Sequence, residues 1–248
     1  MIKYKINIKY KEMFTDFLKN IKEHFSNNNN TIHKARNEIK VLEYTQKKVV
    51  VKAFKIPHLL NRIVYSFFRK SKARKSYEYS VKIRKFVPEP IGYIEFYKGG
   101  LLHQSYFISE HFNYDFTIRE PLLDKNFPQK KAILEAFAYF TFQLHEQEIL
   151  HQDYSPGNIL IKQDDKEFIF NIVDINRMQF KILDLDSRLK NFAKLWISDE
   201  DLTLVAKAYA SLVKKDEELC ITKALYYSHK HKKRINMKKR LKGVKVVD

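Results

Sequence analysis

The sequence of 248 residues has little cysteine, little glycine and no long apolar run. Its single cysteine, Cys220, excludes an intramolecular disulfide and any metal cluster built on several cysteines. No stretch reaches the roughly 18 apolar residues of a membrane-spanning helix. The first eleven residues, MIKYKINIKYK, lack the apolar run of a secretion signal. Together these absences predict a protein of the cytoplasm.

The net charge is the most unusual property of the composition. Lys and Arg number 47 against 29 Asp and Glu, which gives +18, while the 44% hydrophobic content is ordinary for a globular protein. An excess of this size predicts a polyanionic partner, such as a nucleotide, an anionic lipid, an acidic glycan or a nucleic acid. The sequence contains no helix-turn-helix glycine turn, zinc motif or aromatic RNA-binding motif, so nucleic acid is the least favoured of the four.

Alternating and helical patterns divide the first half of the chain into short elements. Residues 12–25 have helical spacing, 38–44 and 49–54 read as a β-hairpin, and 92–97 and 104–112 read as two further strands. A helix is expected after Pro57, and another before Pro88. The first of these carries an apolar stripe, which we interpret as core in preference to membrane contact. The stripe consists of Leu59, Leu60, Ile63, Val64, Phe67 and Phe68.

The second half is mainly helical. Residues 129–150 form the clearest amphipathic helix, and a hairpin over 158–162 and 168–174 follows. The remainder is expected to be helical up to a basic run, HKHKKRINMKKRLKGVK, which we interpret as a solvated tail. The pattern predicts an α+β protein of two lobes. A sheet-containing lobe would span 1–112, and a mainly helical, shortened lobe would span 113–248.

One octapeptide carries chemistry. Between the long helix and the hairpin stands His151-Gln-Asp-Tyr-Ser-Pro-Gly-Asn158, and Asp174 follows at the end of the hairpin. Phosphoryl transfer needs a carboxylate beside the attacking hydroxyl, which Asp153 can supply. It also needs oxygen ligands for Mg²⁺, which Asn158 and Asp174 can supply.

This spacing resembles the catalytic core of the protein-kinase-like superfamily. The resemblance implies a two-lobed kinase-like fold in which His151 braces the loop backbone and Asp153 is the catalytic base. It also implies that Lys52, within Val-Val-Lys-Ala-Phe, holds the phosphates of ATP, with Glu78 as its partner. Lys55 lies three residues beyond Lys52, so the register of this strand stays open.

A closer resemblance is to the lipopolysaccharide core kinase family, the Kdo/WaaP-like kinases. The metal motif reads Asp174-Ile-Asn-Arg177 in place of Asp-Phe-Gly, Ser155 stands where protein-serine kinases carry lysine, and no Ala-Pro-Glu sequence is present. The resemblance implies transfer of the γ-phosphate of ATP, with Mg²⁺, to a sugar hydroxyl of the lipopolysaccharide inner core, on Kdo or heptose. The acceptor would be an anionic glycolipid of the lipid A–Kdo type. Adenine would lie against the strand 105–110, at Glu110. Arg177 is left with two roles, phosphate binding or pairing with an acid.

The glycine-rich phosphate loop of kinases is absent, because no glycine precedes Gly92. Arg36 and Asn37, in the expected turn, are the side-chain donors that could replace it. This departure keeps a non-catalytic pseudokinase open as an alternative. Another alternative is a kinase of the same superfamily that acts on a protein or a small molecule. A cationic aminoglycoside is a poor electrostatic match for a protein of charge +18.

The basic residues also predict attachment to the inner face of the cytoplasmic membrane. A cationic segment, 69–75, follows the apolar stripe, and the basic run 230–242 is interrupted by Ile235, Met237 and Leu241. Basic residues near an anionic bilayer contribute about 1 kcal/mol each to binding. An anionic membrane surface is therefore a predicted partner beside ATP and the glycolipid.

Overall fold

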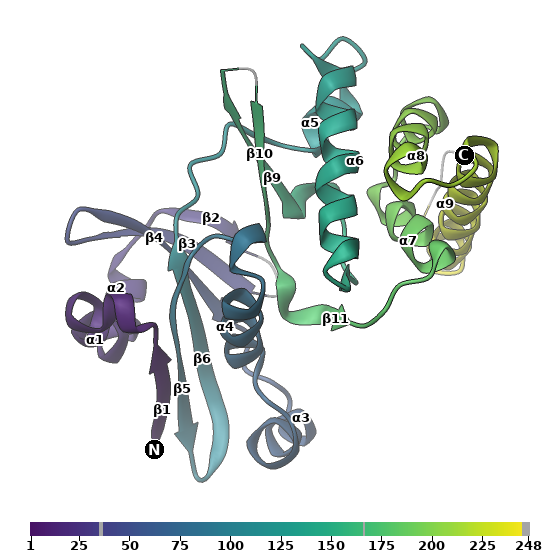
Figure 1. The fold of residues 1–248 in the computed structure, drawn as a ribbon. Coiled ribbons are helices and arrows are strands. Elements are labelled where there is room, and N and C mark those ends of the chain that lie inside the picture. The colour runs from purple at the N-terminus through teal and green to yellow at the C-terminus, as the bar shows by residue number, and fades with distance from the viewer. Residues whose placement is uncertain (35–36, 166, 245–248) are drawn as a thin grey trace. The chain divides into compact units, whose positions relative to one another are not determined.

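The chain divides into two units, Met1–Asn113 and Tyr114–Asp248, in the computed structural model (Figure 1). Residues 1–34, 37–165 and 167–244 are described by the structure. We describe each unit by itself. The assignment of a nucleotide-binding role to residues 1–112 and a catalytic role to 113–248 stays a prediction.

A six-stranded antiparallel sheet forms the frame of the first unit, in the order β1-β5-β6-β4-β3-β2. Both predicted strand pairs are present. The β5–β6 turn is made by Gly99 and Gly100, whose φ values of +56° and +75° cost glycine nothing. The strands are β1 (Ile2–Ile6), β2 (Thr31–Lys34), β3 (Asn37–Tyr44), β4 (Lys47–Phe54), β5 (Pro90–Lys98) and β6 (Leu101–Glu110).

Helices cover both faces of this sheet (Figure 1). On one face lie α1 (Lys11–Lys19) and α2 (Ile21–Asn27), whose apolar side chains meet Val49 and Val51 of β4 in one buried cluster. On the other face, α4 (Lys72–Lys82) packs Ala73 and Tyr77 on Phe54. Successive residues of a strand point to opposite faces, so β4 feeds both clusters. The buried side chains of α1 and α2 are Phe14, Phe17, Leu18, Ile21 and Phe25. The short 3₁₀ helices are η1 (Ile8–Tyr10) and η3 (Arg84–Phe86).

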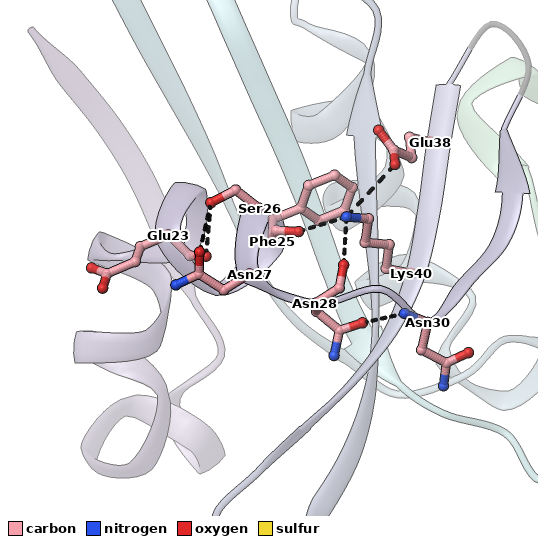
Figure 2. A network of polar contacts seen from close by, with 8 residues as sticks. All are labelled: Glu23, Phe25, Ser26, Asn27, Asn28, Asn30, Glu38 and Lys40. Atoms are coloured by element: carbon pink, nitrogen blue, oxygen red, sulfur yellow. Dashed lines mark hydrogen bonds and ion pairs between the residues drawn. The ribbon is translucent and has the colours of Figure 1, made fainter.

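A buried lysine joins α2 to the sheet (Figure 2). The ammonium of Lys40, in β3, donates hydrogen bonds of 2.7 Å to the carbonyl oxygens of Phe25 and Asn28 and lies 3.7 Å from Glu38 Oε1. The last carbonyls of a helix lack partners within the helix and carry its negative dipole end, so a cation is favoured there. Lys40 therefore closes α2 and holds it against β3.

The apolar stripe after Pro57 is not part of the core. The segment forms α3 (Leu59–Ile63) and a π-helical turn, η2 (Val64–Phe68), and Phe68 is 79% exposed. Its polar side contacts β6: Arg62 Nε donates to the carbonyl of Leu102 (2.9 Å), and the amide of Leu102 donates to Ser66 Oγ (2.8 Å). The expectation of core packing was wrong, because helical spacing shows that a segment has an apolar side but not which side is covered. We call the exposed residues the apolar ridge: Leu59, Leu60, Ile63, Phe67 and Phe68.

The second unit consists of small sheets and a helical bundle. Its strands are β7 (Phe116–Thr117), β8 (Ile149–His151), β9 (Ile159–Asp164), β10 (Glu167–Ile172) and β11 (Met178–Phe180), which pair as β10-β9-β7 and β11-β8. Its helices are α5 (Arg119–Leu123), α6 (Lys130–Glu146), η4 (Pro156–Asn158), η5 (Ile175–Arg177), α7 (Leu185–Asn191), η6 (Phe192–Leu195), α8 (Asp199–Val213) and α9 (Glu217–Arg240). Both α6 and α9 pack on α8, so α6 is buried along one side.

The basic run near the C-terminus belongs to α9 rather than to a solvated tail. The helix continues to Arg240, and Lys232 within the run donates to the carbonyl of Ile197 (2.7 Å). Since α9 also contacts η6, the run is attached to the second unit.

The contacts of Lys40 predict a measurable share of the stability of the first unit. Lys40→Met keeps the aliphatic stem but leaves the Phe25 and Asn28 carbonyls without their donor, and a buried group that loses its partner costs about 1–3 kcal/mol. We expect the free energy of unfolding to fall by about 2 kcal/mol in chemical denaturation followed by circular dichroism. Lys48→Met, at the exposed end of the same hairpin, is the control. Its free energy of unfolding should fall by less than about 0.5 kcal/mol.

Candidate active site

The predicted catalytic residues of the second unit meet around the backbone of Val173. Asp153 lies in the loop after β8, Asn158 ends η4, and Asp174 precedes η5. The amide of Val173 donates to the carbonyl of Asn158 (2.9 Å), and His151 Nε2 bonds the carbonyl of Val173 (2.9 Å). These two bonds tie the octapeptide loop to the end of the β9–β10 hairpin. Asp153, Asn158 and Asp174 are therefore brought to one site.

His151 braces this loop as predicted. Its Nδ1 accepts a hydrogen bond from the backbone amide of Asp153 (3.0 Å), so Nε2 must carry the proton that goes to Val173. The ring is thus neutral, and burial lowers its pKa, which favours that form.

A second buried histidine extends the brace into the helical bundle. Asn191 Nδ2 donates to the carbonyl of His151 (3.0 Å), while its Oδ1 accepts from His145 Nε2 (3.2 Å). His145 Nδ1 then accepts from the hydroxyl of Tyr209 (2.8 Å). Sequence reasoning missed this chain, because its members come from α6, α7 and α8 and no local motif joins them. This chain of hydrogen bonds connects α8 to the backbone of the octapeptide loop and fixes the orientation of that loop.

Asn158 and Asp174 offer the oxygen atoms that Mg²⁺ prefers. Asn158 Nδ2 donates to the carbonyl of Asp153 (2.9 Å), which leaves Oδ1 as the side-chain atom able to bind a metal. Asp174 adopts the left-handed conformation (φ 56°, ψ 43°), uncommon for a residue other than glycine. Such backbone strain occurs at sites where a side chain must be aimed. Asn176 Nδ2 donates to Asp174 Oδ1 (2.5 Å) and orients the carboxylate further.

Two basic side chains lie next to Asp153. Arg177 Nη1 is 3.9 Å from Asp153 Oδ2, and Lys194 donates to the carbonyl of Gln152. Of the two roles left open for Arg177, the structure shows a contact for pairing with an acid, and the guanidinium stays exposed. The sequence offered no signal for Lys194, which stands 41 residues from Asp153 in a run that reads only as a helix.

In the first unit, Lys52 and Lys55 occupy different positions. Lys52 is a residue of β4, paired with Phe107 of β6, and its ammonium lies 5.5 Å from the centre of the Phe54 ring. Lys55 follows the end of β4 and lines a cavity of about 420 Å³ together with Asn37. Asn37 Oδ1 accepts from the amide of Lys55 at 3.4 Å. The other predicted phosphate-loop donor, Arg36, lies outside the described residues. The roles of these residues toward ATP stay predictions.

Glu78 and Glu110 both have partners within the first unit. Glu78 is bonded by Lys70 (2.6 Å) and Arg74 (2.9 Å). Burial raises the pKa of its carboxyl, but these bonds outweigh it and lower the pKa below the ordinary value. Glu110 accepts from the hydroxyl of Tyr10 (2.6 Å) and from Lys47 (3.2 Å). A pair between Glu78 and Lys52, and a contact of Glu110 with adenine, remain predictions.

Comparison with known sequences places the chain in a family. The profile of the "Lipopolysaccharide kinase (Kdo/WaaP) family" matches residues 81–215, more than half of the chain. The chain belongs to this family. The match includes Asp153, Asn158 and Asp174 and begins after Lys52 and Glu78. Among curated proteins, none matches the chain. Membership in a Kdo/WaaP kinase family supports phosphoryl transfer as the reaction class.

One solved structure shows the same fold. WaaP in complex with acyl carrier protein has a TM-score of 0.62 at 14% identity, over 93% of this chain and 98% of that one. The Rio2 kinase of Chaetomium thermophilum, solved as an ADP/Mg²⁺–phosphoaspartate complex, has a TM-score of 0.46 at 16% identity, over 90% of this chain and 71% of that one. The resemblance to the Kdo/WaaP family and the kinase-like α+β fold, both predicted from sequence, are confirmed.

The brace of this Kdo/WaaP family member should weaken in acid. Burial lowers the pKa of His145 to about 4, below the ordinary value of about 6.5. The unfolded chain therefore binds the proton first as pH falls, and stability is lost from about pH 6.5 down through pH 4. We expect His145 to lower the free energy of unfolding by about 2 kcal/mol between pH 7 and pH 5. Denaturant unfolding measures this change, with the fluorescence of Trp196, the single tryptophan, as the probe.

Two variants check the origin of this loss. His145→Gln should be less stable than the wild type at pH 7. Its loss of stability between pH 7 and pH 5 should be smaller than that of the wild type by the share that His145 contributes, because the buried His151 also has a lowered pKa. His229→Gln removes an exposed ring bonded to Asp199 and should lose as much stability between pH 7 and pH 5 as the wild type. An unchanged pH dependence in His145→Gln would assign the loss to other groups.

Proposed function

We propose that the protein is an ATP-dependent kinase that phosphorylates a sugar hydroxyl of the lipopolysaccharide inner core, on Kdo or heptose. The observation that carries the proposal is the junction at Val173, which gathers a base candidate and two oxygen ligands within the region that matches the family. The acceptor class comes from the family, and the reaction class comes from the family together with this geometry.

Asp153 is the base in this proposal. Its side chain is 42% exposed. The backbone of its loop is held by hydrogen bonds with the side chains of His151, Asn158 and Asn191. The acceptor hydroxyl gives its proton to the Asp153 carboxylate as its oxygen bonds the γ-phosphorus of ATP. The bond from that phosphorus to the β–γ bridging oxygen breaks, and ADP leaves with the electron pair. Transfer of this kind depends on positioning and on charge stabilisation more than on covalent chemistry.

Asn158 Oδ1 and the Asp174 carboxylate would hold Mg²⁺. The metal would offset the negative charge of the phosphates during transfer. Both residues are positioned by hydrogen bonds of the protein itself, from Asn158 to the Asp153 carbonyl and from Asn176 to Asp174. In the first unit, Lys52 is proposed to contact the phosphates of ATP, and the end of β6 at Glu110 is proposed to contact adenine.

Substitution of the acids tests this assignment. Asp153→Asn and Asp174→Asn keep the size of the side chain and one acceptor oxygen but remove the charge, so each should reduce phosphate transfer from ATP at least about 100-fold. The assay follows radiolabelled phosphate into deacylated inner-core oligosaccharide at fixed ATP and Mg²⁺. Asp164→Asn, in the exposed β9–β10 hairpin, is the control and should retain full activity.

Other outcomes would change the proposal. Near-native transfer by Asp153→Asn or Asp174→Asn would remove the kinase assignment of these residues. A wild-type protein that binds ATP and acceptor but transfers no phosphate would be the pseudokinase. Transfer to a protein or a small molecule, with none to oligosaccharide, would favour the other kinase alternative.

The apolar ridge supports attachment to an anionic membrane. Leu59, Leu60, Phe67 and Phe68 are each more than 60% exposed, and Arg69 and Lys70 follow directly, both exposed. Apolar groups beside basic ones fit the boundary of an anionic bilayer, where the former enter the acyl region and the latter face the headgroups. Among the residues that the structure describes, no helix combines the length and apolarity needed to cross a bilayer. The ridge is thus proposed as a peripheral contact that brings the enzyme to a lipid-linked acceptor.

Vesicle co-sedimentation tests this contact. We expect binding to phosphatidylglycerol-containing vesicles at low salt, little binding to phosphatidylcholine vesicles, and a several-fold loss in Phe67→Ser/Phe68→Ser. Leu123→Ser/Ile182→Ser removes two equally exposed apolar residues of the second unit and should bind like the wild type.

Unchanged binding of the ridge variant would overturn the membrane contact. The solved WaaP complex contains acyl carrier protein, so that protein is the second probe. Loss of acyl carrier protein binding by the ridge variant, with vesicle binding intact, would assign the ridge to a protein partner.

A further inference from the structure

Basic side chains from three separate elements gather beside Asp153. Arg177 ends η5, with Nη1 3.9 Å from Asp153 Oδ2. Lys194, in η6, donates to the carbonyl of Gln152, one residue before Asp153. The catalytic loop is therefore flanked by two cations that the phosphoryl-transfer step described above does not use.

A third cation comes from α9. Burial lowers the pKa of Lys194; the charge of Asp153 opposes this shift, and the charges of Arg177 and Arg234 add to it. Lys194 thus lies within electrostatic reach of both guanidinium groups. Arg234 Nη2 is also 3.5 Å from His231 Nδ1, and burial, Arg234 and Lys194 together lower the pKa of His231, so the ring is neutral at pH 7. Arg177, Lys194 and Arg234 form what we call the cationic face.

The cationic face has more positive than negative charge. Elsewhere in the second unit, basic residues have acids at hydrogen-bonding distance, such as Lys223 with Asp186 at 2.7 Å and Arg188 with Glu146 at 2.6 Å. Two acids of the site lie near these three cations: Asp153, which is 3.9 Å from Arg177, and Asp174, which directly precedes η5, so the cations outnumber them. Like charges held together raise the free energy of the protein until an anion binds between them. The arrangement therefore fits a ligand with a negative group.

An exposed tryptophan adjoins this face. Trp196 follows η6 in the left-handed conformation (φ 57°) and is 44% exposed, and its ring lies 6.2 Å from that of His231. Lys239 Nζ stands 5.4 Å from the centre of the indole. The flat face of an indole offers packing to the apolar C–H face of a sugar ring. Cations and an exposed aromatic ring beside a phosphoryl-transfer base are the groups that an anionic sugar requires.

We propose that the cationic face binds a negative group, a carboxylate or a phosphate, on the acceptor next to the hydroxyl that is phosphorylated, and that Trp196 packs on the acceptor sugar. The inference rests on the proposed function, because it takes Asp153 as the base. Two guanidinium groups can each bind a carboxylate or phosphate through two parallel hydrogen bonds, which fixes the orientation of the sugar as well as its affinity. With the negative group held there, the neighbouring hydroxyl is presented to Asp153. An acceptor without a negative group would lack this orientation.

Steady-state kinetics with a matched pair of variants on α9 tests the face. Arg234→Gln removes a charge from it, and Lys233→Gln removes the same charge from the exposed neighbouring position. With deacylated inner-core oligosaccharide as acceptor, we expect Arg234→Gln to raise the acceptor KM about tenfold or more and to leave the ATP KM within about twofold. Lys233→Gln should change neither.

The chemical identity of the negative group is tested with modified acceptors. Carboxyl-reduced and dephosphorylated forms of the oligosaccharide are compared in the wild type and in Arg234→Gln. The form that lacks the group bound by the face should show a raised KM in the wild type and no further rise in the variant, as in a double-mutant cycle. A full further rise with both forms would overturn the proposal.

Three other results would also overturn it. Equal effects of Lys233→Gln and Arg234→Gln would mean general attraction by the net charge. A rise confined to the ATP KM would place the γ-phosphate at the face. Unchanged KM values for both acceptor and ATP in Arg234→Gln would show that the cationic face does not bind the acceptor.

Binding is measured separately from turnover. The oligosaccharide should change the fluorescence of Trp196, and Arg234→Gln should shift the midpoint of that titration about tenfold. If the wild type transfers no phosphate while this titration holds, the proposed function fails and the binding face stands. If transfer occurs without Arg234-dependent binding, the face fails and the proposed function stands.

Discussion

The two hydrogen bonds at the backbone of Val173 are the constraint on which the rest of the site depends. One comes from the His151 ring to the carbonyl, and the other runs from the amide to the carbonyl of Asn158. They join a loop that follows β8 to a turn that follows β10. Neither segment could hold Asp153 and Asp174 in register by itself, because each is irregular backbone with few ladder bonds. The chemistry proposed for the second unit therefore depends on a neutral, buried imidazole.

The position of the backbone that carries this imidazole is fixed from outside the loop. Asn191 fixes the carbonyl of His151, and His145 with Tyr209 fixes Asn191, so the direction of each hydrogen bond determines the next. Protonation of either ring would put a donor where a donor already points. The packing of α6 on α8 thus controls the geometry of a loop that neither helix contains. Substitutions far from the acceptor should consequently affect transfer through the loop.

The sequence predicted those parts that a local pattern encodes. Alternation located the β3–β4 and β9–β10 hairpins, and the His151-x-Asp153 spacing located the loop. It could not predict that Leu59–Phe68 faces outward, because both a buried and an exposed apolar side have the same period. Nor could it predict that Lys194, 41 residues after Asp153, lies beside the catalytic octapeptide, or that Arg234 of α9 lies within electrostatic reach of Lys194 through the packing of α9 on η6. Spacing along the chain predicts which residues share a side of one helix or strand. It does not predict which residues of distant elements come into contact.

The same distinction applies to the charge. A value of +18 indicates a polyanionic partner but gives no place for it, because charge is a sum over the whole surface. The structure shows which of these basic residues are used in contacts within the protein. Lys40 binds the last carbonyls of α2, Arg74 bonds Glu78, and Lys232 donates to the carbonyl of Ile197. These charges are used in folding and are unavailable to a partner. The cations that remain beside an exposed aromatic and a candidate base are few, and their position next to Asp153 is what relates the basic composition to an anionic acceptor.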